Sequence, residues 1–150
     1  MAHTLTDLLT HVIFSTRERA PLIADAIREE LHGYLAGIVR ELRATPIMIG
    51  GVADHVHMLF RSPADLAIAD CVRVVKTNSS RWVKKKWPER WNFGWQGGYG
   101  AFSVSESNRA RVIRYIKRQH EHHRKMTFKE EFISFLKKHN VEFDERYIWE

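Results

Sequence analysis

The stretch GGVADHVHMLF, residues 50–60, places His55 and His57 one position apart inside an apolar segment that is typical of a β-strand. Side chains on a strand alternate between its two faces, so both imidazoles lie on the same face. We expect this to be the open face of a sheet, where a substrate can approach. The opposite face is expected to pack against helices through Val56, Met58 and Phe60.

Two imidazoles at positions i and i+2 of a strand can both reach one divalent cation. Nitrogen ligands alone suit zinc, whereas added oxygen ligands favour manganese or magnesium. Histidines at this spacing also occur without a metal, so the pair alone leaves both interpretations open. Asp54 is either a residue of the tight turn at 53–54 or a carboxylate that orients one imidazole through its second ring nitrogen.

The composition indicates a folded protein with a single domain at residues 1–150, of which 44% are hydrophobic. No apolar run approaches the roughly 20 residues that span a membrane. The first 14 residues lack the pattern of a secretory signal, so we expect a cytoplasmic protein. Cys71 is the only cysteine, which excludes an internal disulfide and fits a reducing compartment. We expect it to be a small buried residue.

A net charge of +6 and a pI of about 9.7 make nucleic acid the expected polyanionic partner. Aromatic residues stand among the charges at residues 81–87, a mixture that suits phosphate contact and base stacking. The alternative is that the charges are merely solvated and that the tryptophans pack inward. The candidate DNA-binding residues are Arg17, Arg19, Arg73, Lys76, Arg81, Lys84, Lys85, Trp91 and Trp95.

The periodicity predicts four strands and four helices. The strands are expected at residues 11–15, 45–52, 55–61 and 101–104. The helices are expected at about 21–42, with Pro21 in the first turn, and at 68–86, 105–123 and 127–140. The order βαββαβ predicts an α+β fold, a ferredoxin-like antiparallel sheet with helices on one face. The two C-terminal helices must pack elsewhere, on this subunit or on a partner.

The predicted helix at 105–123 places Tyr115 and Gln119 four residues apart, on one face. The carbonyl oxygen of Gln119 could complete a cation site. A tyrosine has a pKa of about 10 and needs a nearby cation or base to act as a nucleophile. The alternative is ordinary packing, which is the usual role of a tyrosine in a helix, and a glutamine four residues later is common. His120 could lie near such a site, although the histidines at 120, 122 and 123 also suit a solvated helix end.

Together these segments resemble the HUH endonuclease superfamily. HVH at residues 55–57 is similar to its histidine motif, and YIKRQ at 115–119 to the tyrosine helix of its single-tyrosine transposases, found in small bacterial insertion sequences. The resemblance extends, in the right order, over nearly the whole chain. Further matching stretches are HVIFSTR at 11–17, WQGGYGAFSVS at 95–105, EHHRK at 121–125 and VEFDERY at 141–147.

The resemblance implies a transposase that cuts single-stranded DNA at insertion-sequence ends marked by subterminal hairpins. Tyr115 would be the nucleophile of a covalent 5′-phosphotyrosine intermediate, and the other product would be a free 3′-hydroxyl. His55, His57 and Gln119 would bind Mg²⁺ or Mn²⁺. The resemblance also implies a homodimer in which, in at least one state, the tyrosine helix of one subunit completes the other subunit's site. The protein would be bacterial and nucleoid-associated when bound to DNA.

Two other functions fit the same residues. One is a domesticated or non-catalytic protein that binds single-stranded nucleic acid on the same fold. The other is a histidine–metal hydrolase in which Tyr115 only packs. The first would bind DNA without covalent capture, and the second would release a free 5′-phosphate.

Overall fold

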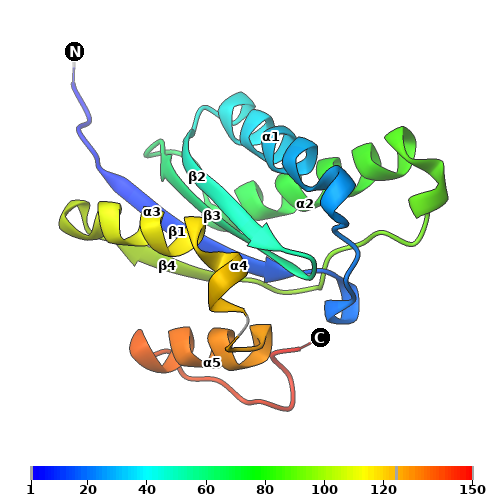
Figure 1. The fold of residues 1–150 in the computed structure, drawn as a ribbon. Coiled ribbons are helices and arrows are strands. Elements are labelled where there is room, and N and C mark those ends of the chain that lie inside the picture. The colour runs from blue at the N-terminus through cyan, green and yellow to red at the C-terminus, as the bar shows by residue number, and fades with distance from the viewer. Residues whose placement is uncertain (1, 124, 150) are drawn as a thin grey trace.

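The computed structural model describes residues 2–123 and 125–149, so Met1, Arg124 and Glu150 of the predicted 1–150 domain lie outside the described residues. Four antiparallel strands form one sheet in the order β2-β3-β1-β4 (Figure 1). Their bounds are β1 Leu8–Ser15, β2 Thr45–Val52, β3 His55–Ser62 and β4 Gly100–Val104. This is the predicted α+β, ferredoxin-like arrangement, with β3 and β1 in the centre.

Strands β2 and β3 form the predicted hairpin, which contains residues 50–60. Val52 pairs with His55, which leaves only Ala53 and Asp54 in the turn. The first strand begins at Leu8, three residues earlier than predicted, because its first half pairs along β3. From Leu9 to Ile13, β1 also pairs with β4 on its other side.

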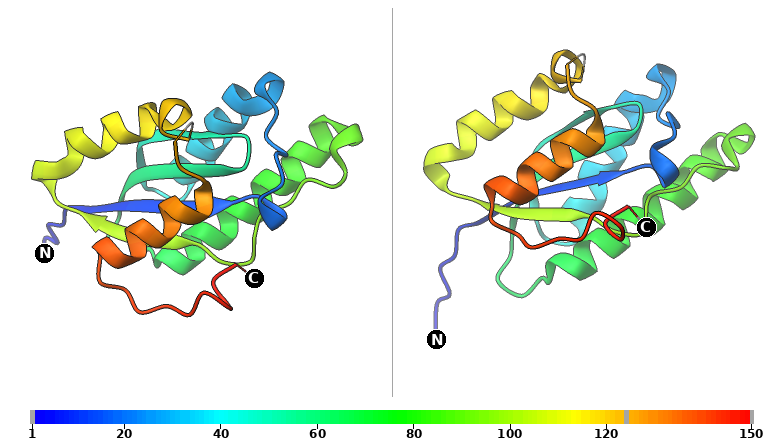
Figure 2. Two further views of the ribbon diagram at one scale, coloured as in Figure 1. Left: turned by 60° about the horizontal axis from the view of Figure 1, so that its bottom comes forward. Right: turned by 90° about the horizontal axis from the view of Figure 1, so that it is seen from below.

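Two helices, α1 (Asp25–Glu41) and α2 (Ile68–Lys86), cover one face of the sheet (Figure 2). Their apolar side chains pack on Val56, Met58 and Phe60, which form the predicted helix-facing set of β3. The bounds of α2 agree with the prediction. Helix α1 begins at Asp25, so the placement of Pro21 in its first turn was wrong. Pro21 follows the short 3-10 helix η1 (Arg17–Arg19) instead.

The other face of the sheet is not open, contrary to our expectation. Helices α3 (Arg109–Lys117), α4 (Gln119–His122) and α5 (Phe128–Lys138) lie over it (Figure 1). Ile116 of α3 packs on Leu9 and Leu59, while a second cluster of side chains joins α5 to β1 and β4. The members of that cluster are Ile13, Phe102, Phe128, Phe132 and Leu136. The extra helices therefore pack on the same chain.

The helix predicted at 105–123 is broken in two. A 3-10 turn, η3 (Glu106–Asn108), precedes α3, and the backbone leaves the helical region at Arg118 (φ −96°, ψ 16°) before α4 begins. Arg118 is an ordinary helix former, so no glycine or proline marked this break in the sequence. The bend brings Gln119 against His55.

Gly50 of β2 permits the close approach of α3. A Cβ atom at Gly50 would lie 2.7 Å from Cγ2 and 2.8 Å from the carbonyl oxygen of Ile116. Real Cβ atoms essentially never come this close to backbone, so α3 would have to shift. Tyr115 is the neighbour of Ile116, and its position therefore depends on residue 50 being glycine.

We predict that Gly50→Ala lowers the free energy of unfolding by about 1–3 kcal/mol, the usual cost of overpacking. The matched control is Gly33→Ala in α1, where an added Cβ meets nothing within 4 Å. That change should stabilise the protein by about 0.5–1 kcal/mol, because alanine restricts the unfolded chain. Urea unfolding measures both. Equal stability of Gly50→Ala and the parent would contradict the tight packing of α3.

Candidate metal centre and tyrosine site

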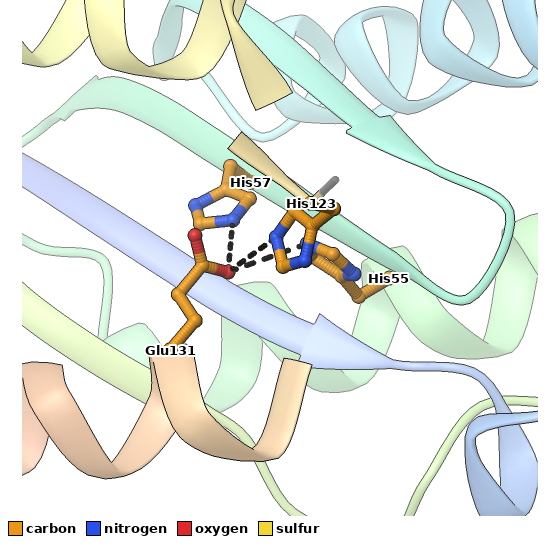
Figure 3. Close-up of side chains that lie close together, drawn as sticks. All are labelled: His55, His57, His123 and Glu131. Carbon is orange, nitrogen blue, oxygen red and sulfur yellow. Dashed lines mark hydrogen bonds and ion pairs between the residues drawn. The ribbon is translucent and has the colours of Figure 1, made fainter. Parts of the chain in front are cut away.

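The two histidines of β3 are completely buried beneath the C-terminal helices. Their Nε2 atoms point toward the same carboxylate oxygen, Oε1 of Glu131 on α5, at 3.3 Å from His55 and 3.0 Å from His57 (Figure 3). Strand alternation placed both imidazoles on one face, as expected. The side chain that faces them comes from a helix 70 or more residues later in the chain.

Each of these imidazoles is held by a partner at its other ring nitrogen. Asp54 Oδ1 lies 2.7 Å from Nδ1 of His55, and Nε2 of His11 lies 2.8 Å from Nδ1 of His57. Both rings are thereby fixed with Nε2 directed into the site. Metal-binding histidines are commonly oriented in this way.

Gln119 enters the site from the start of α4. Its Oε1 is 3.1 Å from Nε2 of His55, and its Nε2 is 3.3 Å from Glu131 Oε2. The side chain is 1% exposed. The three residues proposed as metal ligands from the sequence are therefore brought together.

Two candidate metal ligands were not predicted as site residues, and neither was His122, which contacts both Tyr115 and Glu131. His123 and Glu131 join His55 and His57 in a group whose candidate ligand atoms all lie within 4.8 Å of one another. Figure 3 shows Glu131 reaching up from α5 to the three imidazoles. A signal for Glu131 was present in the sequence, because this carboxylate falls on the apolar stripe formed by Phe128, Phe132 and Phe135. A charge on such a stripe indicates a buried partner.

Tyr115 lies at the edge of the same site. Its hydroxyl donates to Glu131 Oε2 and is 3.2 Å from Nε2 of His122. The phenol ring meets the His57 ring edge-on, with 5.7 Å between centroids. All of these contacts lie within one chain.

Burial and charge set the protonation states of the site. Burial alone would raise the pKa of Glu131, but hydrogen bonds from His123, His55 and His57 hold it far below its usual range. Burial lowers the pKa of His57 to about 4. For His55, the hydrogen bonds to Asp54 and Glu131 outweigh burial and raise the pKa to about 9.

Burial and the adjacent Glu131 carboxylate raise the pKa of Tyr115 well above its ordinary value. A negatively charged neighbour disfavours the phenolate, and it also accepts the hydrogen bond of the neutral phenol. Tyr115 is therefore held protonated by the same carboxylate that balances the imidazoles. Neutralisation of this carboxylate would remove one of the causes of the raised Tyr115 pKa.

The donor set fits a divalent cation. It combines imidazole nitrogens with a carboxylate and an amide oxygen, all of which are metal ligands in proteins. Asp54 and His11 supply the outer hydrogen bonds that the ligand rings of His55 and His57 need. This histidine–glutamate cluster supports a divalent metal here.

The other predicted residues lie away from this cluster. His120 is exposed, whereas its neighbours His122 and His123 turn inward. Arg73, Arg81, Lys84 and Lys85 are exposed on α2, across the sheet from the site, and Arg73 pairs with Asp70 at 3.7 Å. Arg17 and Arg19 lie in η1, and the guanidinium of Arg19 sits 5.5 Å from the Trp149 ring centre.

Lys76 and Trp95 have structural contacts. The Lys76 ammonium donates to the carbonyls of Gln96 and Gly98 at 2.9 and 2.6 Å, and burial lowers its pKa to about 8. The Trp95 indole donates to Ser79 at 2.9 Å. Trp91, by contrast, is 76% exposed. Among the aromatic candidates, Trp91 is therefore the more accessible.

The fold and the site together define a class: a ferredoxin-like sheet with paired histidines, a carboxylate and a tyrosine on its covered face. The chain belongs to the family of IS200-like transposases, whose model matches residues 4–119. It is accordingly a transposase of that family. His123, Glu131 and the rest of the C-terminal segment lie beyond the matched residues.

Individual relatives agree with this assignment. The chain is 28% identical over 116 residues to the ISDra2 transposase TnpA of Deinococcus radiodurans, covering 74% of this chain and 83% of the relative. A crystal structure of a candidate transposase from Deinococcus radiodurans R1 superposes with a TM-score of 0.64 at 24% identity, covering 79% of this chain and 95% of that one. A REP-associated tyrosine transposase bound to a REP hairpin gives 0.62 at 14% identity, covering 82% and 72%. These two structures support the fold.

We predict that Asp54→Ala weakens Mn²⁺ binding by about 10–100-fold, the usual cost of removing a group that orients a metal-bound histidine. Calorimetric titration with Mn²⁺ measures the change. Asp70→Ala on the exposed surface of α2 is the matched control and should bind Mn²⁺ like the parent. An unchanged affinity in Asp54→Ala would show that Asp54 is only a turn residue.

Proposed function

We propose that this protein is a metal-dependent single-strand DNA endonuclease and strand transferase, acting through a covalent 5′-phosphotyrosine on Tyr115. The observation that carries the proposal is the meeting of the phenol, the paired histidines and Gln119 in one buried site. Packing alone does not explain why the hydroxyl and two imidazoles converge on one carboxylate. The membership of the chain in a transposase family gives this site its substrate class.

The proposed reaction begins with attack of the Tyr115 oxygen on a DNA phosphorus atom. A bond from that oxygen to phosphorus forms while the bond from phosphorus to the 3′ oxygen breaks. The phenol proton passes to His122 Nε2, which already contacts the hydroxyl, and the leaving 3′ oxygen takes a proton from water. The released 3′-hydroxyl can later attack the phosphotyrosine and restore the phenol. Because the phosphodiester energy stays in the covalent intermediate, rejoining needs no external energy source.

His55, His57, Gln119 and Glu131 would hold the divalent cation, with His123 beside them. When bound, the cation polarises the phosphate oxygen and offsets the negative charge that grows in the transition state. Mg²⁺ and Mn²⁺ are the candidate ions, and the imidazole nitrogens favour Mn²⁺ of the two. With Glu131 engaged by a cation, its carboxylate would no longer oppose ionisation of Tyr115.

The proposed substrate is single-stranded DNA with subterminal hairpins. A structural relative of this chain was solved with a REP hairpin. The net charge of +6 supports phosphate contact, and the exposed basic residues of α2 together with Trp91 are candidates for the hairpin contacts. Within residues 2–123 and 125–149, no helix is long and apolar enough to cross a membrane.

We further propose that two copies act together, since each chain supplies one nucleophilic tyrosine and an insertion sequence has two ends. The contacts of Tyr115 with Glu131 and His57 support a site that is complete within each subunit. The arrangement in which one subunit's tyrosine serves the other's histidines then belongs to a different state.

We predict that Tyr115→Phe abolishes the covalent adduct and leaves DNA affinity within about twofold. The phenyl ring keeps the packing but has no attacking oxygen. The substrate is single-stranded DNA from the sequence flanking the gene, with Mn²⁺, resolved on a denaturing gel. The control is Tyr147→Phe, because Tyr147 is 60% exposed; this variant should form the adduct normally. Cutting by Tyr115→Phe with a free 5′-phosphate would establish the metal hydrolase instead.

Mixing two inactive variants distinguishes the two ways of assembling the site. Tyr115→Phe and His57→Ala, co-expressed so that subunits can associate, should not restore cutting when each site uses residues of one chain. If the tyrosine acted on the partner's histidines, half of the sites in a mixed dimer would be intact. Recovery of a substantial fraction of parental cutting would therefore overturn the single-chain arrangement as the state that cuts DNA. Light scattering of the mixture reports whether dimers are present.

A further inference from the structure

A cavity of about 310 Å³ opens beside Tyr115, between β4, α3 and α5. Tyr115, His122 and Glu131 form one end of it, so the cavity is continuous with the site described above. Its volume lies at the small end of pockets that hold ligands, about 300–1,000 Å³. No residue of the cavity other than those at the Tyr115 end and His11 has a role in the proposed chemistry.

One wall of the cavity is an aromatic platform. The ring centroid of Phe102 lies 4.6 Å from that of His139, with an interplanar angle of 29°, and 5.4 Å from that of Phe135, with an angle of 32°. The Phe135 and His139 rings are nearly parallel, at 6°. Phe102 is buried, whereas Phe135 is half-buried and His139 is exposed. Flat aromatic surfaces of this kind stack nucleobases with little preference for sequence.

The rest of the lining combines the apolar residues Val104, Val112 and Met126 with polar and basic groups. Arg111 of α3 and Lys138 of α5 are both exposed, and Asn108 and Ser134 add neutral hydrogen-bonding groups. Glu131 is the only acidic residue among the lining residues, and it is turned toward the imidazoles. An aromatic wall with cationic groups at the rim matches a base and its phosphate.

We propose that this cavity is a subsite for one unpaired nucleotide directly adjacent to the scissile phosphate. The proposal rests on the proposed function, because it takes Tyr115 as the atom that meets the phosphate. A strand whose phosphate lies at the Tyr115 hydroxyl must continue on either side of it, and this cavity begins at that hydroxyl. The base stacks on the platform of Phe135 and His139. Arg111 and Lys138 contact the flanking phosphate.

The subsite gives a reason for the position of α5. Helix α5, which carries Glu131, also carries Phe135 and Lys138, and His139 follows at its C-terminal end. One element therefore closes the metal site and builds the wall that places the neighbouring nucleotide. Binding energy from that base would hold the scissile phosphate against Tyr115, which is how contacts away from the reacting atoms assist a reaction.

The test uses an oligonucleotide with the flanking hairpin and its adjoining unpaired stretch, in a series with a single abasic site at each unpaired position. Binding is measured with the intact chain carrying Tyr115→Phe, and adduct formation with the parent chain. We expect one position, beside the cut, where loss of the base weakens binding at least about fivefold, the smaller effect of one base–aromatic stack. Phe135→Leu, which keeps apolar volume but removes the ring, should bind the intact and the abasic oligonucleotides equally.

Arg111→Gln provides a variant at an exposed residue that leaves the core untouched. It should weaken binding and reduce the salt dependence of affinity, whereas Arg114→Gln, on an exposed position of the same helix outside the cavity lining, should not. An abasic scan without any sensitive position, or a sensitive position that Phe135→Leu leaves unchanged, would overturn the subsite. Base-sensitive binding without any adduct in the parent would instead overturn the proposed reaction and leave the subsite standing.

Discussion

The site depends on one buried carboxylate. Glu131 is 1% exposed and lies against four imidazoles and a phenol, on the inner face of α5. An unpaired charge in that position would cost several kcal/mol, so α5 can cover the sheet only while the histidines of β3 face it. The same contacts oppose ionisation of Tyr115. The interaction that holds α5 on the sheet is thus also the one that keeps Tyr115, the proposed nucleophile, protonated.

The two faces of the sheet are covered by two different layers of helices. Helices α1 and α2 cover one face with an ordinary apolar core, and that face carries no residue of the site. The other face carries Leu9, Leu59 and Ile13 among its polar groups, which gives α3 and α5 enough apolar contact to stay in place. Gly50 lets α3 approach closely. The histidines lie on a central strand, where both backbone edges are paired, so their positions are rigid.

Local patterns predicted most of the fold and about half of the site. Alternation along residues 55–60 assigned each side chain to its face, and the 53–54 turn and the helix at 68–86 followed from nearby residues. The capping box at Thr127 also marks the observed start of α5. The break at Arg118 could not be predicted, because it is made by contacts of Gln119 with a distant strand. The covering of the histidine face was missed for the same reason.

Glu131 and His123 could not be assigned to the site from motifs in the sequence. The strand histidines, Tyr115 and Gln119 belong to motifs that resemble a known family, and the family match itself ends at residue 119. Glu131 stands beyond that boundary and beside Glu130, which caps the helix from an exposed position. Only its place on the apolar stripe distinguished it. His11 lies on the same face as His57, but the partner of a buried histidine is settled by the pairing of β1 with β3.

We propose that His55, His57, Gln119 and Glu131 of one chain hold a divalent cation beside Tyr115. The sharpest test is anomalous diffraction from a crystal soaked in Mn²⁺. We expect one strong peak among the Nε2 atoms of the two β3 histidines and the Glu131 carboxylate, with the Tyr115 hydroxyl nearby in the same chain. The absence of a peak there, with Glu131 still paired to the imidazoles at saturating Mn²⁺, would contradict it.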